Sequence, residues 1–306
     1  MSVQDSWHLD DLIEEYQGYQ RRARGLSEAT LHGYERIQRP FLQAALGENP
    51  IHPSRLRSTD VIEFVTSRSA RWSPRSMKGV RTALRSLFRF LRMQGISDER
   101  LELAIPPPAH WRLSGLPRHL SSEELTRVLA SLETSTPCGP RNRAIVLCLS
   151  TLGLRPGEVA RLRLDDIDWR AGTIRIRARK NRRDSVLPLP REVGEAIVDY
   201  LRDHRPETPR RRVFVQHGPR RGEPIRARTV SAVVVSALRR AGVDSPIGGA
   251  YVLRHTVASR MVQAGASLKE VADFLGHCCL DTTVIYAKLD LPALREVALP
   301  WPEALR

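Results

Sequence analysis

The chain has 306 residues, enough for two ordinary domains, and its 41% hydrophobic and 27% charged residues are typical of a folded globular protein. No apolar run approaches the roughly 20 residues that cross a bilayer, so we expect no membrane partner and a cytoplasmic location. The 49 Lys and Arg residues exceed the 34 Asp and Glu residues by 15. Such an excess favours a polyanionic partner, although a GC-rich genome, which raises the arginine content of its proteins, would produce the same excess.

The four cysteines, Cys138, Cys148, Cys278 and Cys279, match no zinc-ligand spacing. His277 stands beside Cys278, but one histidine next to two adjacent cysteines makes a poor metal site. We therefore expect reduced, packed thiols in a reducing compartment, and neither a metal ion nor another cofactor.

Residues 8 to 95 have the periodicity of helices joined by short connections. In a predicted helix at about residues 75–93, apolar side chains recur at helical spacing. Another face of this helix carries five cations with no acid to pair with them, which suits a DNA backbone better than a merely solvated face. These candidate DNA-binding residues are Lys78, Arg81, Arg85, Arg89 and Arg92.

Periodicity stops between Ile105 and Pro117, where four prolines predict a stiff interdomain linker. Order resumes at a capping box formed by Ser121 and Glu124, which predicts the start of a helix. We therefore divide the chain into an N-terminal helical domain at 1–108, a linker at 109–118 and a second domain at 119–306.

The second domain begins with helices and changes pattern between residues 166 and 188. Residues 173–177 alternate with period two and residues 185–188 follow a polar turn, so we expect a small antiparallel sheet with residues 180–184 near a hairpin tip. Helical patterns return at about 190–203, 227–241, 254–264 and 268–275, and Ser267 with Glu270 supplies a capping box for the last of them. The predicted fold class is mainly α with a small antiparallel β-sheet (α+β).

Four segments of the second domain carry the residue types that metal-free phosphodiester transfer needs. That reaction requires fixed cations for the non-bridging oxygens, an in-line nucleophile and an acid for the leaving 5′ oxygen. Arginine suits the first task because its planar fork binds phosphate, and lysine suits the last because it can release a proton. The segments are residues 151–158 (TLGLRPGE), 180–184 (KNRRD) with 186–189 (VLPL), 251–256 (YVLRHT), and 275–277 (LGH) with 282–286 (TTVIY).

In this order and at these spacings, the four segments resemble the tyrosine recombinase (phage integrase) family, which includes the Xer-type site-specific recombinases. The resemblance covers residues 120–290 well and the remainder loosely. It implies a two-domain C-shaped clamp, in which a helical, SAM-like core-binding domain and a catalytic domain with a C-terminal tail helix enclose DNA. It further implies strand breakage and rejoining through a 3′-phosphotyrosyl intermediate.

The same resemblance implies the partners and the cellular setting. The partners are double-stranded DNA with inverted core sites and further recombinase subunits, in a homo- or hetero-tetramer on synapsed DNA. The protein is then expected on the nucleoid. Residues 291–297 resemble the tail helix that docks into a neighbouring subunit.

The resemblance also assigns roles to individual residues. Arg155 and Arg254 match the two phosphate-binding arginines, and Glu158 matches an acid that orients Arg155. His277 matches a histidine that donates a hydrogen bond to the phosphate. Tyr286 matches the nucleophile.

Lys180 matches the hairpin lysine that acts as the general acid, and the composition adds an independent indication. The chain has only four lysines among its 49 basic residues, so a lysine within the arginine-rich residues 177–183 is unexpected unless a releasable proton matters. The alternative is one more phosphate-contacting cation.

One position departs from the family pattern, because Tyr251 stands where a histidine is usual, three residues before Arg254. A phenol can donate or accept a hydrogen bond, but it is no base at neutral pH as imidazole is. We include Tyr251 among the candidate catalytic residues. We expect His255, directly after Arg254, to be a buried structural residue.

Two other functions stay open at this point. A type IB topoisomerase-like enzyme uses the same chemistry on one duplex, and strand exchange between two duplexes distinguishes it. A weakly catalytic, DNA-binding accessory protein is suggested by Tyr251, and formation of a covalent adduct distinguishes that one. Chromosome dimer resolution, integration and transposition are equally compatible with these residues.

Overall fold

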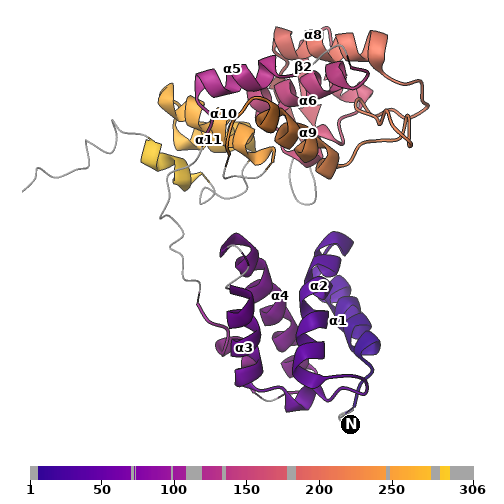
Figure 1. Ribbon diagram of the computed structural model, residues 1–306, viewed down its shortest axis with the longest axis vertical. Coiled ribbons are helices and arrows are strands. Elements are labelled where there is room, and N and C mark those ends of the chain that lie inside the picture. The colour runs from indigo at the N-terminus through magenta and orange to yellow at the C-terminus, as the bar shows by residue number, and fades with distance from the viewer. Residues whose placement is uncertain are drawn as a thin grey trace, which may run out of the picture. The chain divides into compact units, whose positions relative to one another are not determined.

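The computed structural model describes residues 6–69, 72, 74–97, 99–107, 119–132, 136–177, 184–245, 249–276 and 283–289. The chain separates into two compact units, Met1–Ser114 and Gly115–Arg306. Helices dominate both units, and the second unit also holds one small antiparallel sheet (Figure 1). The predicted α+β class with two domains is therefore confirmed. The expected linker at 109–118 lies outside the described residues.

The first unit consists of helices that pack around an aromatic core. The ring of Phe41 makes T-shaped contacts with Phe64 and Phe88, at centroid distances of 5.1 and 5.5 Å. Tyr16 is buried, and its hydroxyl donates a hydrogen bond to Ser86 Oγ at 2.8 Å. The elements are α1 (Leu9–Arg24), α2 (Glu28–Leu46), the 3₁₀ turn η1 (Pro53–Arg55), α3 (Ser58–Ser69), α4 (Pro74–Met93) and the 3₁₀ turn η2 (Leu101–Leu103).

The basic face of α4 is less uniform than its sequence indicates, and this corrects the expectation of five cations without an acid. Arg81 is only 8% exposed, and its guanidinium donates to the carbonyl oxygens of Pro106 at 2.9 Å and Pro107 at 3.3 Å. Arg92 forms an ion pair with Glu102 at 2.8 Å. These partners follow α4 in the chain, so the helix sequence alone cannot show them.

The other three cations of the predicted basic face remain available to a ligand to different degrees. Lys78 and Arg89 are exposed, whereas Arg85 is half-buried. Lys78 and Arg89 are therefore the better candidates for contact with a DNA backbone, and Arg81 and Arg92 have structural partners within the first unit.

The second unit surrounds its sheet and its central helix with further helices. The sheet has the order β1-β2-β3, with antiparallel pairing that aligns Thr173 with Pro188 and Ile176 with Ser185. The predicted hairpin tip lies mostly outside the described residues. The elements are α5 (Ser122–Ala130), α6 (Gly139–Leu152), α7 (Pro156–Val159), η3 (Leu164–Asp166), β1 (Ile167–Asp168), β2 (Thr173–Ile176), β3 (Ser185–Pro188), α8 (Arg191–Asp199), the π-helical turn η4 (Tyr200–His204), α9 (Ala227–Arg240), α10 (Tyr251–Gln263), α11 (Leu268–Leu275) and η6 (Val284–Leu289).

Helix ends in this unit follow the capping rules that the sequence predicted. At α5, Ser121 and Glu124 form the reciprocal capping box, and Ser267 with Glu270 does the same at α11. Within the described part of the chain, no helix combines the length and the apolar character needed to cross a bilayer.

Helix α6 is the centre of the second unit, and α8, α9 and α10 all pack against it. It is buried on nearly all sides, including Cys148, whose thiol pKa is raised to about 12 by burial. That environment agrees with the expectation of a packed thiol. The helix ends at Gly153, which has a φ of +61°. A Cβ there would lie 2.6 Å from Leu275 Cδ2, so α6 ends in close contact with the end of α11.

Replacing Gly153 with alanine is expected to lower the free energy of unfolding more than the same change at Gly172. Both residues have φ near +60°, so alanine incurs a left-handed backbone cost of about 1–2 kcal/mol at each. Only at Gly153 does the new methyl group also collide with a buried side chain, because nothing lies within 4 Å at Gly172. Urea denaturation of both variants measures the difference. Equal losses would contradict the close packing of α6 against α11.

Candidate active site

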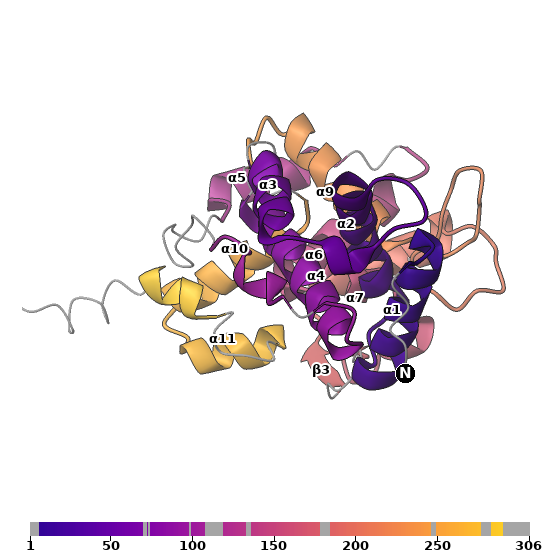
Figure 2. The same cartoon turned by 90° about the horizontal axis from the view of Figure 1, so that it is seen from below.

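The candidate residues that the structure describes lie around the contacts between α10, α11 and η6 in the second unit. Figures 1 and 2 show α10 and α11 side by side. Helix α10 carries Tyr251, Arg254 and His255, and Tyr286 belongs to η6. Arg155 precedes α7 as its N-cap residue. Three segments that are far apart in sequence therefore contribute to one cluster.

Arg254 joins the ends of two helices through its side chain. Its Nη1 donates to the carbonyl oxygen of Gly153, after the end of α6, at 2.6 Å, and its Nη2 donates to the carbonyl oxygen of Leu275, the last residue of α11. The last carbonyls of a helix lack partners within the helix and carry its partial negative charge. A guanidinium can donate to both carbonyl oxygens at once, and these two bonds fix the Arg254 side chain. They also supply acceptors for a charged group that is only 6% exposed.

Arg155 is held next to this arrangement by a carboxylate and by a third main-chain carbonyl. Glu158 accepts hydrogen bonds from the main-chain N–H of Arg155 at 2.7 Å and from its Nη1 at 2.8 Å. Nη2 donates to the carbonyl oxygen of Gly276 at 3.0 Å. The structure thus places Glu158 where an acid can orient the Arg155 guanidinium, and both arginines bond to neighbouring residues at the end of α11.

The two guanidinium groups influence each other electrostatically. Burial, and then the positive charge of Arg155, lower the pKa of Arg254 to about 10, and Glu158, Tyr286 and Tyr251 oppose this shift. Arg254 nevertheless stays charged at neutral pH. Two nearby cations, one of them buried, repel each other until an anion lies between them, so this arrangement favours an anionic ligand.

Tyr286 is buried in a small apolar cluster with Val257, Val262, Val271 and Leu275, and is 2% exposed. Burial raises the pKa of its phenol to about 12, and the charge of Arg254 acts in the opposite direction. The hydroxyl is therefore protonated at neutral pH, and it lies close enough to Arg254 for the two groups to interact.

His255 differs from its expectation in burial, because the sequence predicted a fully buried side chain. It is half-buried rather than buried, and its Nδ1 lies 2.5 Å from the Tyr286 hydroxyl oxygen. The two rings are 5.6 Å apart at an interplanar angle of 52°. The available signal was its position, directly after Arg254 and one helical turn beyond Tyr251.

Tyr251 is the first residue of α10, and it is 42% exposed. It is among the groups that act on the charge of Arg254, so it lies at the same cluster. Lys180 and His277 lie outside the described residues, as do Cys278 and Cys279. The structure therefore brings together Arg155, Glu158, Tyr251, Arg254 and Tyr286 from the predicted set.

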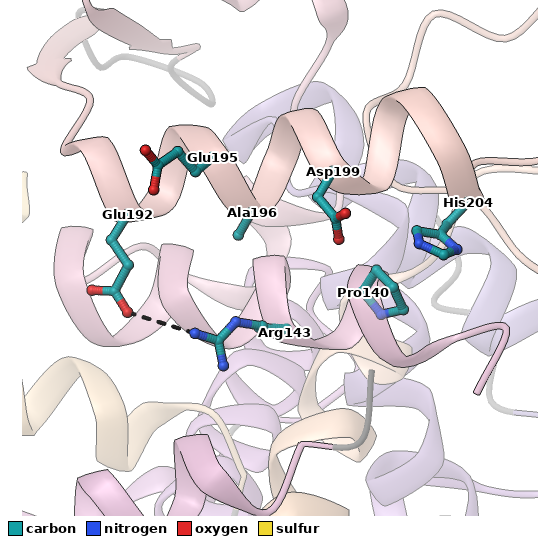
Figure 3. Close-up of a pocket in the computed structure, with 7 residues that line it drawn as sticks. All are labelled: Pro140, Arg143, Glu192, Glu195, Ala196, Asp199 and His204. Atoms are coloured by element: carbon teal, nitrogen blue, oxygen red, sulfur yellow. Dashed lines mark ion pairs between the residues drawn. The ribbon is translucent and has the colours of Figure 1, made fainter. Parts of the chain in front are cut away.

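A surface pocket between α6 and α8 offers a contrast (Figure 3). Arg143 on α6 and Glu192 on α8 reach toward each other, with Nη2 and Oε1 4.0 Å apart. The pocket contains three carboxylates and a single guanidinium, so its charge is unfavourable for a phosphate group. Its lining residues are Pro140, Arg143, Glu192, Glu195, Ala196, Asp199 and His204.

Comparison with family models matches both units of the chain. Residues 118–291 match the model of the phage integrase family, and residues 13–95 match the phage integrase N-terminal SAM-like domain. The first match spans more than half of the chain and contains every candidate catalytic residue. The second contains the whole of α4 with all of its cations.

Comparison of the chain with individual proteins also finds integrases and recombinases. The chain is 43% identical to y4rA of Sinorhizobium fredii, a protein assigned as an integrase/recombinase, over 96% of this chain and 71% of that protein. It is 31% identical to tyrosine recombinase XerA of Thermococcus kodakarensis, over 94% of each. The fold is similar to that of the XerH site-specific recombinase in a post-cleavage complex with a palindromic difH substrate, with a TM-score of 0.72, 22% identity and coverage of 95% and 85% of the two chains.

Replacing Arg254 with lysine is expected to lower the free energy of unfolding by about 1–3 kcal/mol, because one ammonium group cannot satisfy both helix-terminal carbonyls and a buried acceptor is left unpaired. Arg260→Lys is the matched control, since Arg260 is exposed on the same helix and its replacement should change stability by less than about 0.5 kcal/mol. Urea denaturation measures both. Equal stability of the two variants would show that the carbonyl contacts of Arg254 are dispensable.

Proposed function

Because this chain belongs to the phage integrase family of tyrosine-type site-specific recombinases, we propose that Arg155, Arg254 and Tyr286 form the centre at which it breaks and rejoins DNA strands. The observation that carries this proposal is the juxtaposition of two fixed guanidinium groups with a tyrosine hydroxyl. The enzyme thus has an anion-binding pair beside a side chain that can form an ester with phosphate.

The two arginines bind the scissile phosphate. A guanidinium has five N–H donors, and the hydrogen bonds that the described residues make to Arg254 use two of them. The remaining donors can bond to the non-bridging oxygens, together with those of Arg155. Because both side chains are already held by main-chain carbonyls and Glu158, little reorganisation is needed when negative charge develops on the phosphate.

Tyr286 is the nucleophile in this proposal. Its oxygen forms a bond to phosphorus while the bond from phosphorus to the 5′ oxygen breaks, and a 3′-phosphotyrosine results. Lys180 protonates the departing 5′ oxygen, and His277 donates a hydrogen bond to the phosphate. Attack by a 5′ hydroxyl reverses these steps, so the bond energy is retained and no cofactor is consumed. Since Tyr286 is 2% exposed, DNA binding must open a path from the scissile phosphate to its hydroxyl.

Tyr251 acts in this proposal as a hydrogen-bond donor to the phosphate. Its exposure, its place one turn before His255 and its electrostatic influence on Arg254 support this role. A neutral phenol supplies a hydrogen bond without the charge of an imidazolium, so the site relies on its arginines and on Lys180 for positive charge.

The proposed partner is double-stranded DNA with inverted core sites, bound on the nucleoid in the cytoplasm. We assign residues 1–108 to core binding and residues 119–306 to catalysis, in keeping with the two family matches. Exchange between two duplexes cuts four strands and each chain supplies one nucleophile, so the active assembly is a homo- or hetero-tetramer. Residues 291–297 are the proposed contact to the neighbouring subunit.

Replacing Tyr286 with phenylalanine is expected to abolish the covalent protein–DNA complex and to leave DNA affinity within a few-fold of the parent, since only the attacking oxygen is removed. Denaturing electrophoresis after incubation with a nicked suicide substrate detects the adduct. Tyr251→Phe is the matched control, because it removes the other hydroxyl at the site and should still form adduct. An adduct that survives in Tyr286→Phe refutes the assignment.

Replacing Lys78 and Arg89 together with alanine is expected to weaken binding to all DNA sequences alike and to reduce the slope of log affinity against log salt by about 2, since each phosphate contact adds about one. Arg81→Ala is the control, because buried Arg81 bonds to the carbonyls of Pro106 and Pro107. It should lower the unfolding midpoint and leave the slope unchanged. DNA-binding titrations at several salt concentrations measure the slope. An unchanged slope in the double variant would show that Lys78 and Arg89 do not contact the DNA backbone.

A further inference from the structure

The proposed nucleophile has a hydrogen-bond partner with no assigned role. His255 Nδ1 lies 2.5 Å from the Tyr286 hydroxyl oxygen, and the two side chains come from different elements, α10 and η6. Helix α10 packs directly on η6, so the contact is part of the packing of the unit. Tyr286 is almost completely buried, whereas His255 is only half-buried.

The position of His255 on α10 relates it to the one departure from the family pattern. Residues 251 and 255 are one turn apart and therefore lie on the same face of the helix. Tyr251 occupies the place where an imidazole is usual, and a phenol is no base at neutral pH. An imidazole is nevertheless present at the site, one turn further along the helix.

Attack by Tyr286 requires a group that can accept the proton of its hydroxyl. Burial raises the pKa of its phenol to about 12, so the hydroxyl holds its proton firmly, and a neutral phenol is a weak nucleophile. The arginines at the site remain charged and cannot accept a proton. Lys180 has to be protonated at the start of cleavage if it is to supply the proton for the leaving oxygen.

Building on the proposed function, we propose that His255 is a further catalytic residue, the general base that accepts the phenolic proton of Tyr286 as its oxygen bonds to phosphorus. The proton passes from the Tyr286 oxygen to Nδ1 while the bond to the 5′ oxygen breaks and that oxygen takes a proton from Lys180. On rejoining, the 5′ hydroxyl attacks phosphorus and gives its proton to Lys180, and the His255 imidazolium returns its proton to the departing tyrosine oxygen.

The arrangement meets the geometric requirements for this role. A general base must lie within hydrogen-bond distance of the proton that it removes, and the 2.5 Å separation satisfies this. The base must begin with Nδ1 unprotonated, which places the ring hydrogen on Nε2. The partial exposure of His255 stabilises the imidazolium that forms, because a charged ring is better tolerated there than in the apolar cluster around Tyr286.

The test measures single-turnover cleavage by the full chain with His255→Asn and His255→Ala. An asparagine amide can occupy the position of Nδ1 and accept a hydrogen bond from Tyr286, but it cannot take the proton. General-base catalysis typically contributes about 10²–10⁴-fold, so both variants should be slowed by that factor. Each is measured on an ordinary phosphodiester and on a substrate with sulfur at the 5′ bridging position.

Two further comparisons locate the effect on the nucleophile. Sulfur leaves without protonation, so it should rescue Lys180→Ala but neither His255 variant. Replacing Tyr286 with 3,5-difluorotyrosine, whose phenol is more acidic, should restore part of the rate that His255→Asn loses. DNA affinity and the unfolding midpoint of each variant show whether the site has remained folded, and His255→Asn carries the test if His255→Ala does not fold.

Three outcomes would overturn the proposal. Near-parental cleavage by His255→Asn would reduce His255 to a residue that orients Tyr286. Faster cleavage by either variant would show that the bond restrains Tyr286 instead of activating it. Sulfur rescue of His255→Asn would move the residue to the leaving-group side. Failure of the proposed function would give a different result, because Tyr286→Phe would then still form the adduct.

Discussion

The arrangement of the site depends on one buried guanidinium that bonds to the ends of two helices. Arg254 donates to the carbonyl of Gly153, directly after α6, and to the last carbonyl of α11, and Gly153 allows those helix ends to approach because it has no side chain. The same contact positions α10, on which Arg254, His255 and Tyr251 lie. Removing the guanidinium leaves helix-terminal carbonyls without donors, so the site and the local fold are stabilised by the same bonds.

The bonds that fix Arg254 and Arg155 hold two positive charges close together, and this favours the binding of an anion. Arg155 bonds to Gly276 and Glu158, next to the residue that Arg254 binds, and the charge of each arginine disfavours the other. A phosphate that enters between them relieves this repulsion and meets donors that are already oriented. The buried phenol of Tyr286 stays neutral in the resting protein, with its hydroxyl in contact with His255.

Much of this could be predicted from local sequence. The capping boxes at Ser121 and Ser267 marked helix starts correctly, and the alternation at residues 173–177 indicated the central strand of the sheet. These features depend on residues within a few positions of each other. The candidate residues Arg155, Arg254 and Tyr286 were identified through motif order, and the structure places them in one cluster.

What sequence reasoning missed depends on contacts between distant residues. Arg81 and Arg92 looked like free cations because their partners, the carbonyls of Pro106 and Pro107 and the carboxylate of Glu102, come after α4 in the chain. The contact of His255 with Tyr286 could not be predicted because it spans 31 residues and depends on how η6 packs against α10. A helix pattern shows which residues share a face, but it does not show which element covers that face.

The account is tested most directly by locating the covalent bond to DNA. The adduct that forms on a nicked suicide substrate can be digested with nuclease and trypsin and analysed by mass spectrometry. Cleavage after Lys269 and Lys288 places Tyr286 in a peptide of residues 270–288, and cleavage after Arg240 and Arg254 places Tyr251 in a peptide of residues 241–254. Each peptide contains a single tyrosine. Attack by Tyr286 predicts a 3′-phosphonucleotide on residues 270–288 at Tyr286; a nucleotide on residues 241–254, or on neither peptide, would contradict that assignment.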